Sequence, residues 1–321
     1  IIGTFTVTDG DNDTVVRGFE FNITDANTPT AGSAAASVDD DGLAGGNAAS
    51  TAGDLNANTG DAGPNVTEAI FEGTLGGSVG PDGAGANGFS FGANTTAVIG
   101  LETVTYTVVG NVLTAKITAS TDASRLNTNL FTVEITNKAT GAYKVTLLDN
   151  VLHAGGPNDE ATDALASINY TITDADGSVV PGSTLTITFD DDAPSATAEA
   201  AQPVVEGTTV AGVFDFAPGA DGAGISHINA VALTFDAGTG WSQWVDLGAG
   251  EVRVKAGGAY EFKADAVTLS PVAAITGTFT VTDGDKDTAI GGFEFNITDA
   301  NKPVVGSAAA SVDDDGLAGG N

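Results

Sequence analysis

The sequence contains no cysteine. A disulfide framework, thiolate metal sites and catalysis by a thiol nucleophile are therefore excluded. Histidine is almost absent as well, with only His153 and His227, and no G-x-S-x-G nucleophile motif occurs. These absences predict that the chain is not an enzyme and that each histidine lies in a loop or on the surface.

Basic residues are also scarce, because 10 Lys and Arg stand against 42 Asp and Glu and give a formal net charge of -32. Such a chain repels nucleic acid phosphates and anionic lipids, so no nucleic-acid partner is expected and divalent cations are the natural ligands. Its hydrophobic fraction of 41% is that of a folded protein, which places the acidity in loops. No apolar run reaches the about 18 residues of a membrane span, and direct membrane insertion is not expected.

Helical periodicity is missing, whereas strand periodicity is frequent. Residues 4–8, 19–23, 103–109 and 184–189 alternate apolar residues with Thr, Glu or Asn and are rich in β-branched and aromatic side chains. The connections between such segments contain many of the 44 glycines together with Asp and Asn, which is typical of turns in short-strand sandwiches. The sequence thus predicts an all-β fold of tandem β-sandwich domains with Gly/Asp-rich loops.

Part of the sequence is duplicated. Residues 3–47 return as residues 277–321, with 38 of 45 positions identical. A tandem array with a period of 274 residues is therefore predicted, and such an array spans distance more readily than it catalyses.

A weaker repeat divides this long period. Residues 170–194 parallel residues 279–303, each with a strand, an Asp-rich turn, a second strand and an acidic end at proline. Residues 73–85 and 212–224 share the pattern G-x6-G-x-D-G-A-G, which indicates a common domain opening. The predicted organisation is the last hairpin of a preceding short domain over 1–29, a long sandwich with an acidic insertion over 30–194, a short sandwich over 195–303, and the start of the next long domain over 304–321.

These motifs resemble the extender repeats of very large adhesins that Gram-negative bacteria export by type I secretion, the repeats-in-toxin class. The resemblance is carried by GTLGGSVGPDGAG at 73–85, by YTITDADG at 170–177 and by DDDAP at 190–194. It implies immunoglobulin/cadherin-like sandwiches with Ca²⁺ at the domain junctions, in a stalk at the bacterial cell surface whose partners are neighbouring repeats. The GGxGxD calcium roll of such proteins is missing, so the chain is expected to be stalk and not secretion signal.

The hairpin turns are the first candidate Ca²⁺ ligands, because Ca²⁺ prefers carboxylate and carbonyl oxygens on flexible loops. Three carboxylates at alternate positions of a tight turn can converge. Thr14 and Thr288 stand where an EF-hand loop needs glycine, so that motif is rejected, while a solvated turn remains the alternative. The candidate residues are Asp9, Asp11 and Asp13, their copies Asp283, Asp285 and Asp287, and the shorter pair Asp174 and Asp176.

The predicted domain junctions are the second group of candidates. Like charges in a linker repel, so a stiff linker would gain from an ion that bridges two domains. A flexible acidic spacer is the alternative. The junction candidates are Asp190, Asp191 and Asp192 before Pro194, and at the corresponding places Asp25 with Asn27 and Asp299 with Asn301.

A third acidic stretch precedes a glycine-rich segment in both copies. It provides Asp39, Asp40 and Asp41, repeated as Asp313, Asp314 and Asp315. The stretch is interpreted either as a Ca²⁺-ordered loop, which the family resemblance supports, or as a low-complexity insertion. Asp82 and Asp221, which lie in the shared opening motif, are expected to form turns.

Three other functions were weighed against the stalk. An extracellular filament or surface-layer subunit, in which copies of the chain pair by edge strands, suits the same composition. Trp241 and Trp244, with Tyr260 and Phe262, could form a sugar-stacking platform. The Thr-x-Thr strands could bind ice, although this would need flat repeated arrays of threonine.

Overall fold

The computed structural model describes residues 1–25, 27–46, 68–153, 164–266, 274–300 and 305–313, together with Gly316 and Ala318. Within these residues the chain forms strands and no α-helix, and its one named helical element is a 3-10 turn over Ala123–Arg125. No helix in this described part is long and apolar enough to cross a membrane. The prediction of an all-β fold is confirmed.

The chain divides into two compact units, which we describe separately. Unit 1 comprises Ile1–Ser195 with the segments Ala217–Ala223 and Thr282–Ala289. Unit 2 comprises Ala196–Phe216, Gly224–Val281 and Ile290–Asn321. The turn over 282–289 thus belongs to unit 1, although the chain on both sides of it belongs to unit 2.

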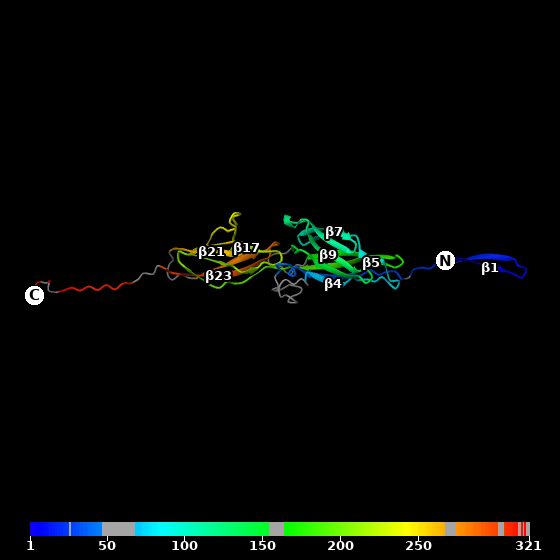
Figure 1. The fold of residues 1–321 in the computed structure, drawn as a ribbon, viewed down its shortest axis with the longest axis horizontal. Coiled ribbons are helices and arrows are strands. Elements are labelled where there is room, and N and C mark those ends of the chain that lie inside the picture. The colour runs from blue at the N-terminus through cyan, green and yellow to red at the C-terminus, as the bar shows by residue number, and fades with distance from the viewer. Residues whose placement is uncertain are drawn as a thin grey trace. The chain divides into compact units, whose positions relative to one another are not determined.

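Unit 1 contains a sandwich of two sheets (Figure 1). A six-stranded sheet has the order β4-β10-β9-β8-β7-β6, and a four-stranded sheet has the order β3-β12-β11-β5. The first sheet comprises β4 Ile70–Thr74, β6 Thr96–Ile99, β7 Glu102–Val109, β8 Val112–Ala119, β9 Asn129–Asn137 and β10 Ala142–Leu147. The second comprises β3 Ser33–Asp39, β5 Ala84–Phe91, β11 Ala164–Asp174 and β12 Val179–Asp190.

The core of unit 1 follows from the period-two pattern of its strands. Along β11, buried residues alternate with exposed or half-buried ones from Ala164 to Asp174, as a strand with one face in a core requires. Phe131 of β9 and Phe189 of β12 are fully buried, and their ring centroids lie 5.1 Å apart. Strand β3 pairs with β12 in parallel, with Asp39 opposite Asp190, so both strands end at the same edge of the sheet.

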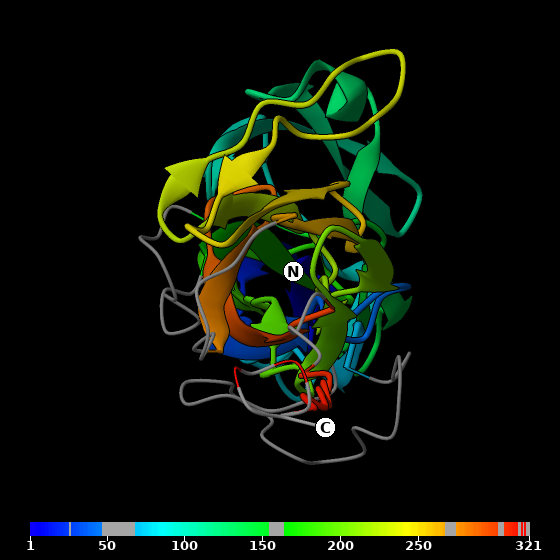
Figure 2. The ribbon, with the colours of Figure 1, turned by 90° about the vertical axis from the view of Figure 1, so that its left-hand side faces the viewer.

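Unit 2 is a second sandwich (Figure 1, and end-on in Figure 2). Its sheets have the orders β14-β23-β22-β17-β18 and β15-β21-β20-β19. Phe262 and Phe295 stack at 4.0 Å in its core, and Phe214 and Phe279 stack at 4.8 Å. The remaining strands of the chain are β13 Ser195–Ala196, β14 Gln202–Val205, β15 Thr209–Val213, β16 Phe216–Ala217, β17 Gly224–Ile228, β18 Val231–Ala232, β19 Val245–Asp246, β20 Gly250–Val254, β21 Ala259–Ala264, β22 Ile275–Thr282 and β23 Thr288–Thr298.

The duplicated sequence forms a hairpin in both copies, but only one copy is buried. At the N-terminus, β1 (Ile2–Thr8) pairs with β2 (Thr14–Glu20) in a two-stranded sheet of its own. Phe5 and Phe21 of this copy are 50% and 60% exposed. The corresponding Phe279 and Phe295 of β22 and β23 are 0% and 1% exposed. The same apolar face is therefore a core face in unit 2 and a surface in the N-terminal hairpin.

Candidate metal centre

Acidic residues from several segments of unit 1 meet in one cluster. Because β3 and β12 run parallel and end together at Asp39 and Asp190, the acidic stretches 39–41 and 190–192 begin side by side. The segments 217–223 and 282–289 bring further aspartates to the same place. We call this group the central cluster, and it consists of Asp40, His153, Asp191, Asp221, Asp283, Asp285 and Asp287.

Two sets of three residues in the central cluster have the spacing of ligands around one ion. Asp191, Asp285 and Asp287 form an all-oxygen set, and Asp40, His153 and Asp191 form a set that includes one ring nitrogen. In each set the ligand atoms lie within 4.8 Å of one another. Oxygens bound to Ca²⁺ at about 2.3–2.6 Å are at most about 5 Å apart across the ion, so the all-oxygen set fits Ca²⁺.

Backbone groups hold these carboxylates in place. The amide of Val151 donates to Asp40 Oδ2 at 3.1 Å, and that of His153 donates to Asp285 Oδ2 at 2.8 Å. The other oxygens of these two carboxylates, both called Oδ1, are buried and have no hydrogen-bond donor among the described residues. A buried carboxylate oxygen without a donor is costly, and a cation removes that cost.

Burial and mutual repulsion raise the pKa of the central carboxylates. Desolvation, followed by the charge of Asp285, raises the pKa of Asp221 to about 8. Desolvation, followed by the hydrogen bond and charge of Asp285, raises the pKa of Asp283 to about 9. The pKa of Asp40 is also raised well above its usual value, by desolvation and then by the charge of Asp221. The site thus favours ionised carboxylates only when another positive charge is present.

His153 supplies the imidazole of the central cluster, and it lies in a loop, which is one of the two positions predicted for it, but it is buried and not on the surface. Its side chain is 1% exposed, with Nδ1 3.0 Å from Asp191 Oδ1. Burial disfavours the imidazolium, but the hydrogen bond and charge of Asp191 outweigh this and raise the pKa of His153 to about 9. Val151 and Leu152, which are both buried, precede it, and this apolar pair was the sequence signal for its burial. His227 is half-buried on β17.

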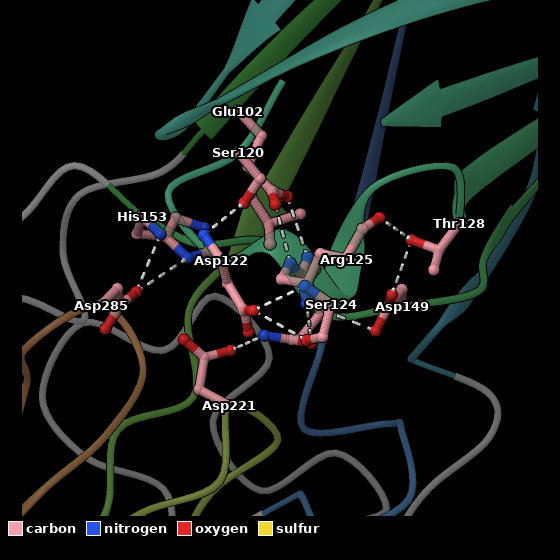
Figure 3. Close-up of polar contacts among 12 residues, drawn as sticks. Glu102, Ser120, Asp122, Ser124, Arg125, Thr128, Asp149, His153, Asp221 and Asp285 are labelled. Carbon is pink, nitrogen blue, oxygen red and sulfur yellow. Dashed lines mark hydrogen bonds and ion pairs between the residues drawn. The ribbon is translucent and has the colours of Figure 1, made fainter. Parts of the chain in front are cut away.

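A buried arginine supports the loop that carries His153 (Figure 3). Arg125 Nε and Nη2 donate to Glu102 Oε1 and Oε2 at 2.7 and 2.9 Å, and Nη1 donates to Asn150 Oδ1 at 2.7 Å. Asn150 Nδ2 in turn donates to Asp221 Oδ1. Sequence reasoning missed this network, because residues 102, 125 and 150 share no motif.

Arg125→Met should therefore destabilise the protein strongly. It leaves Glu102, which is 1% exposed, without its charged partner, and breaking a buried ion pair in this way costs about 3–5 kcal/mol. Urea unfolding in the presence of Ca²⁺ measures the loss. Arg17→Met on the exposed strand β2 is the matched control and should change the free energy of unfolding by less than about 0.5 kcal/mol. Similar losses in both variants would contradict the assigned role of Arg125.

A second cluster brings together three residues that the sequence placed in two separate candidate groups. Asp25, Asp174 and Asp176 have ligand oxygens within 4.8 Å of one another. Asp174 is 1% exposed, and its Oδ2 has no donor among the described residues. Ser178 Oγ donates to Asp25 Oδ2 at 2.9 Å, and Asn27 Nδ2 donates to Asp82 Oδ1 at 3.4 Å.

The central and second clusters use corresponding parts of the repeats. Asp25 and Asp191 lie in acidic stretches that end at a proline, and Asp174 and Asp283 lie in matching hairpin turns. The shared opening motif supplies Asp82 beside the second cluster and Asp221 in the central one. Asp221 thus belongs to an acidic site, which goes beyond the turn-forming role expected for it.

The other sequence candidates are distributed as follows. Asp9, Asp11 and Asp13 converge as predicted but are exposed, and we call them the hairpin cluster. Asp39, Asp41, Asp190 and Asp192 are buried beside the central cluster without belonging to its three-residue sets. Asp299 and Asp313 fall in none of the sets found among the described residues. Asn301, Asp314 and Asp315 lie outside the described residues.

Two of the four aromatic residues proposed as a sugar platform are buried, and the two tryptophans contact a cation. Tyr260 and Phe262 are 7% and 0% exposed in the core of unit 2. The guanidinium of Arg253 lies 4.8 Å from the ring centroid of Trp241 and 4.6 Å from that of Trp244. Arg253 therefore covers one face of each tryptophan ring with a cation–π contact, which leaves less ring surface for a sugar.

Comparison with known proteins finds no matching family model and no matching curated protein. Among solved structures, the EC1-3 fragment of mouse clustered PcdhgC3 aligns with 93% of this chain and 77% of its own length, at 10% identity and a TM-score of 0.27. Human CDH23 EC21-23 aligns with 61% of this chain and 58% of its own length, at 18% identity and a TM-score of 0.23. The titin domains z1z2, solved in complex with telethonin, align with 67% of this chain and 96% of their own length, at 11% identity and a TM-score of 0.28.

Proposed function

We propose that this chain is an extender segment of a large, calcium-dependent adhesin of the repeats-in-toxin class, secreted to the bacterial cell surface. Its role is mechanical and not enzymatic: it holds binding modules away from the cell. The resemblance of residues 73–85, 170–177 and 190–194 to such repeats supports the class. The charge of -32 and the carboxylate clusters support the dependence on Ca²⁺.

The observation that carries the proposal is the repetition of the acidic site. The central and second clusters are assembled from corresponding acidic linkers, opening turns and hairpin turns. A chain that repeats these three segments repeats the site as well, so each period of 274 residues adds further Ca²⁺ sites to the array.

Ca²⁺ in the central cluster would act as a strut. It would fasten the turn 282–289, which connects β22 and β23, to the ends of β3 and β12. Without the ion, the ionised carboxylates of these segments repel one another. The connection between the turn 282–289 and the ends of β3 and β12 would therefore be stiff with Ca²⁺ and mobile without it.

The exposed N-terminal hairpin supports the tandem array. Its apolar face is the one that Phe279 and Phe295 bury in unit 2, where Phe295 stacks on Phe262. We infer that a sandwich of the same kind covers Phe5 and Phe21 in the full array. Neighbouring repeats of the same chain are thus the proposed partners.

Small-angle X-ray scattering of the full chain tests the strut. With excess Ca²⁺ we expect one well-defined maximum dimension, and with excess chelator a broader distance distribution and a changed maximum dimension. Scattering profiles that superimpose in the two conditions would rule the strut out. Magnesium at the same ionic strength is the control for charge screening, because Mg²⁺ demands a tighter octahedral site and loses its waters reluctantly.

Assembly between chains is the second candidate, and the same hairpin favours it. A contiguous exposed apolar face is an interaction surface, and a second copy of the chain could cover it. Mass measurement with and without Ca²⁺ separates the two functions. A stalk segment stays monomeric at all concentrations of Ca²⁺, whereas a filament or surface-layer subunit grows in mass.

A further inference from the structure

The central cluster contains an imidazole among carboxylates, and this ligand does not suit Ca²⁺. Calcium takes oxygen ligands, whereas imidazole nitrogen suits Zn²⁺, Cu²⁺, Ni²⁺ and iron. His153 is one of only two histidines in the chain and is 1% exposed. Its position in the cluster needs an explanation other than the all-oxygen sites.

The imidazole ring is oriented as in a metal ligand. His153 Nε2 lies 3.2 Å from the backbone oxygen of Phe189, and a carbonyl oxygen can only accept a hydrogen bond. Nε2 therefore carries the proton in the neutral ring, and the lone pair of Nδ1 points toward the carboxylates. Metal-binding histidines are usually held in this way, with the second ring nitrogen donating to a carbonyl or a carboxylate.

Two carboxylates complete a set of three ligands around this nitrogen. Asp191 Oδ1 lies 3.0 Å from His153 Nδ1. Asp40 is fully buried, and its Oδ1 has no donor among the described residues, while its Oδ2 is held by the amide of Val151. Bonds of about 2.0–2.2 Å to zinc separate neighbouring ligands by about 3.0–3.5 Å, so a small contraction of the set around Asp191 is enough.

We propose that Asp40, His153 Nδ1 and Asp191 bind one Zn²⁺ ion, at a site distinct from the all-oxygen set of Asp191, Asp285 and Asp287. Two carboxylates neutralise the charge of the ion, and the imidazole gives selectivity over Ca²⁺. Asp191 belongs to both sets, so its carboxylate would lie between the two ions. The zinc ion would join the ends of β3 and β12 to the loop that contains His153.

The structure also provides a path to the cluster. A groove of about 700 Å³ opens to solvent and is lined by residues that include Leu152, Asp221 and Asp285. The groove thus reaches two carboxylates of the central cluster, although Asp40, His153 and Asp191 themselves do not line it. Solvent therefore comes close to the proposed zinc site through Asp221 and Asp285.

Zinc binding to the full chain at saturating Ca²⁺ tests the proposal. We expect one tightly bound Zn²⁺ per chain, with a single imidazole in the X-ray absorption spectrum of the bound zinc. His153→Asn should weaken zinc affinity at least tenfold and leave Ca²⁺ binding to the all-oxygen sets in place. His227→Asn is the matched control and should leave zinc affinity unchanged. Asp40→Asn should also weaken zinc binding, although it leaves the His153 imidazole in place. Because two different variants remove a zinc ligand, a folding defect in one of them does not decide the test.

Several outcomes would overturn the zinc site. Zinc that binds wild type and His153→Asn equally would occupy the calcium sites or the exposed carboxylates. A zinc absorption spectrum without imidazole leads to the same conclusion. If NMR shows His153 protonated at both ring nitrogens with zinc in excess, the imidazolium is a built-in counter-ion and no zinc site exists. The proposed calcium function stands in all three cases, because Ca²⁺ binding is measured separately on the same samples.

Discussion

Asp285→Asn should remove most of the stabilisation that Ca²⁺ gives to this protein, whereas Asp11→Asn should remove little of it. The two aspartates are copies of each other in the duplicated sequence. Asp285 is 7% exposed in the central cluster, and Asp11 lies in the exposed hairpin cluster. The pair therefore isolates the effect of the buried site from the effect of the local sequence.

The expected size of the stabilisation by Ca²⁺ follows from the linkage between ligand binding and folding. Ca²⁺ at about 100 times its dissociation constant stabilises the folded state by about 2.7 kcal/mol per site. For a domain of this size this raises Tm by about 5–10 °C. Wild type and Asp11→Asn should show this rise, and Asp285→Asn should show less than half of it.

Without calcium, the order of the melting temperatures of these proteins should be different. Replacing Asp285 by the isosteric amide removes a charge that raises the pKa of Asp221 and Asp283, so it relieves repulsion in the cluster. With chelator, Asp285→Asn is expected to melt at the same temperature as wild type or above it. Thermal melts of the three proteins in Ca²⁺ and in chelator give all six values. Equal calcium-dependent rises in Asp285→Asn and Asp11→Asn would contradict the central site.

Calcium should also remove most of the pH dependence of stability. The folded-state pKa of Asp221 and of Asp283 lies at about 8 and about 9, above the ordinary value of 3.8. The calcium-free folded state thus binds more protons than the unfolded state between about pH 4 and pH 9, and its stability falls as the pH rises through this window. His153 adds to the same trend, because its raised pKa gives stability that is present below about pH 6.5 and lost as the pH rises through about 9.

Ca²⁺ needs the carboxylates in their ionised form, so its binding releases protons and strengthens as the pH rises. Between pH 5 and pH 8, we expect Tm in chelator to fall by at least about 3 °C, which corresponds to about 1 kcal/mol for a domain of this size. Over the same range, Tm in excess Ca²⁺ should stay nearly constant, because these carboxylates are ionised both in the Ca²⁺-bound folded state and in the unfolded state. Melts across this range in both conditions provide the measurement. Two parallel curves would show that the buried carboxylates do not bind the ion.

Local patterns were enough to predict the strands and most of the acidic ligands. The alternation over 103–109 appears in β7, and the D-x-D-x-D turn brings three carboxylates together in the first copy and two of them, Asp285 and Asp287, in the second. The segment 19–23 illustrates the limit of local patterns, because β2 ends at Glu20. The identical residues 293–297 all lie within β23, which continues to Thr298. The core of unit 2 extends the strand in one copy, whereas the other copy forms a two-stranded sheet of its own.

The joining of the acidic segments could not be predicted, because it depends on long-range pairing. The sequence shows aspartates at 39–41, 190–192 and 283–287 as three separate candidates. Only the parallel pairing of β3 with β12 brings the first two together. His153 carries no motif at all, and its role follows from the burial of its neighbours and from the carbonyl oxygen of Phe189.

The position of bound calcium in crystals grown with the ion tests the central claim most directly. We expect anomalous scattering from a Ca²⁺ ion within about 2.6 Å of carboxylate oxygens of Asp191, Asp285 and Asp287, and from a second ion at Asp25, Asp174 and Asp176. The account would be contradicted by crystals in which calcium occupies only exposed carboxylates such as those of the hairpin cluster. In that case the buried carboxylates would be protonated and hydrogen-bonded to one another.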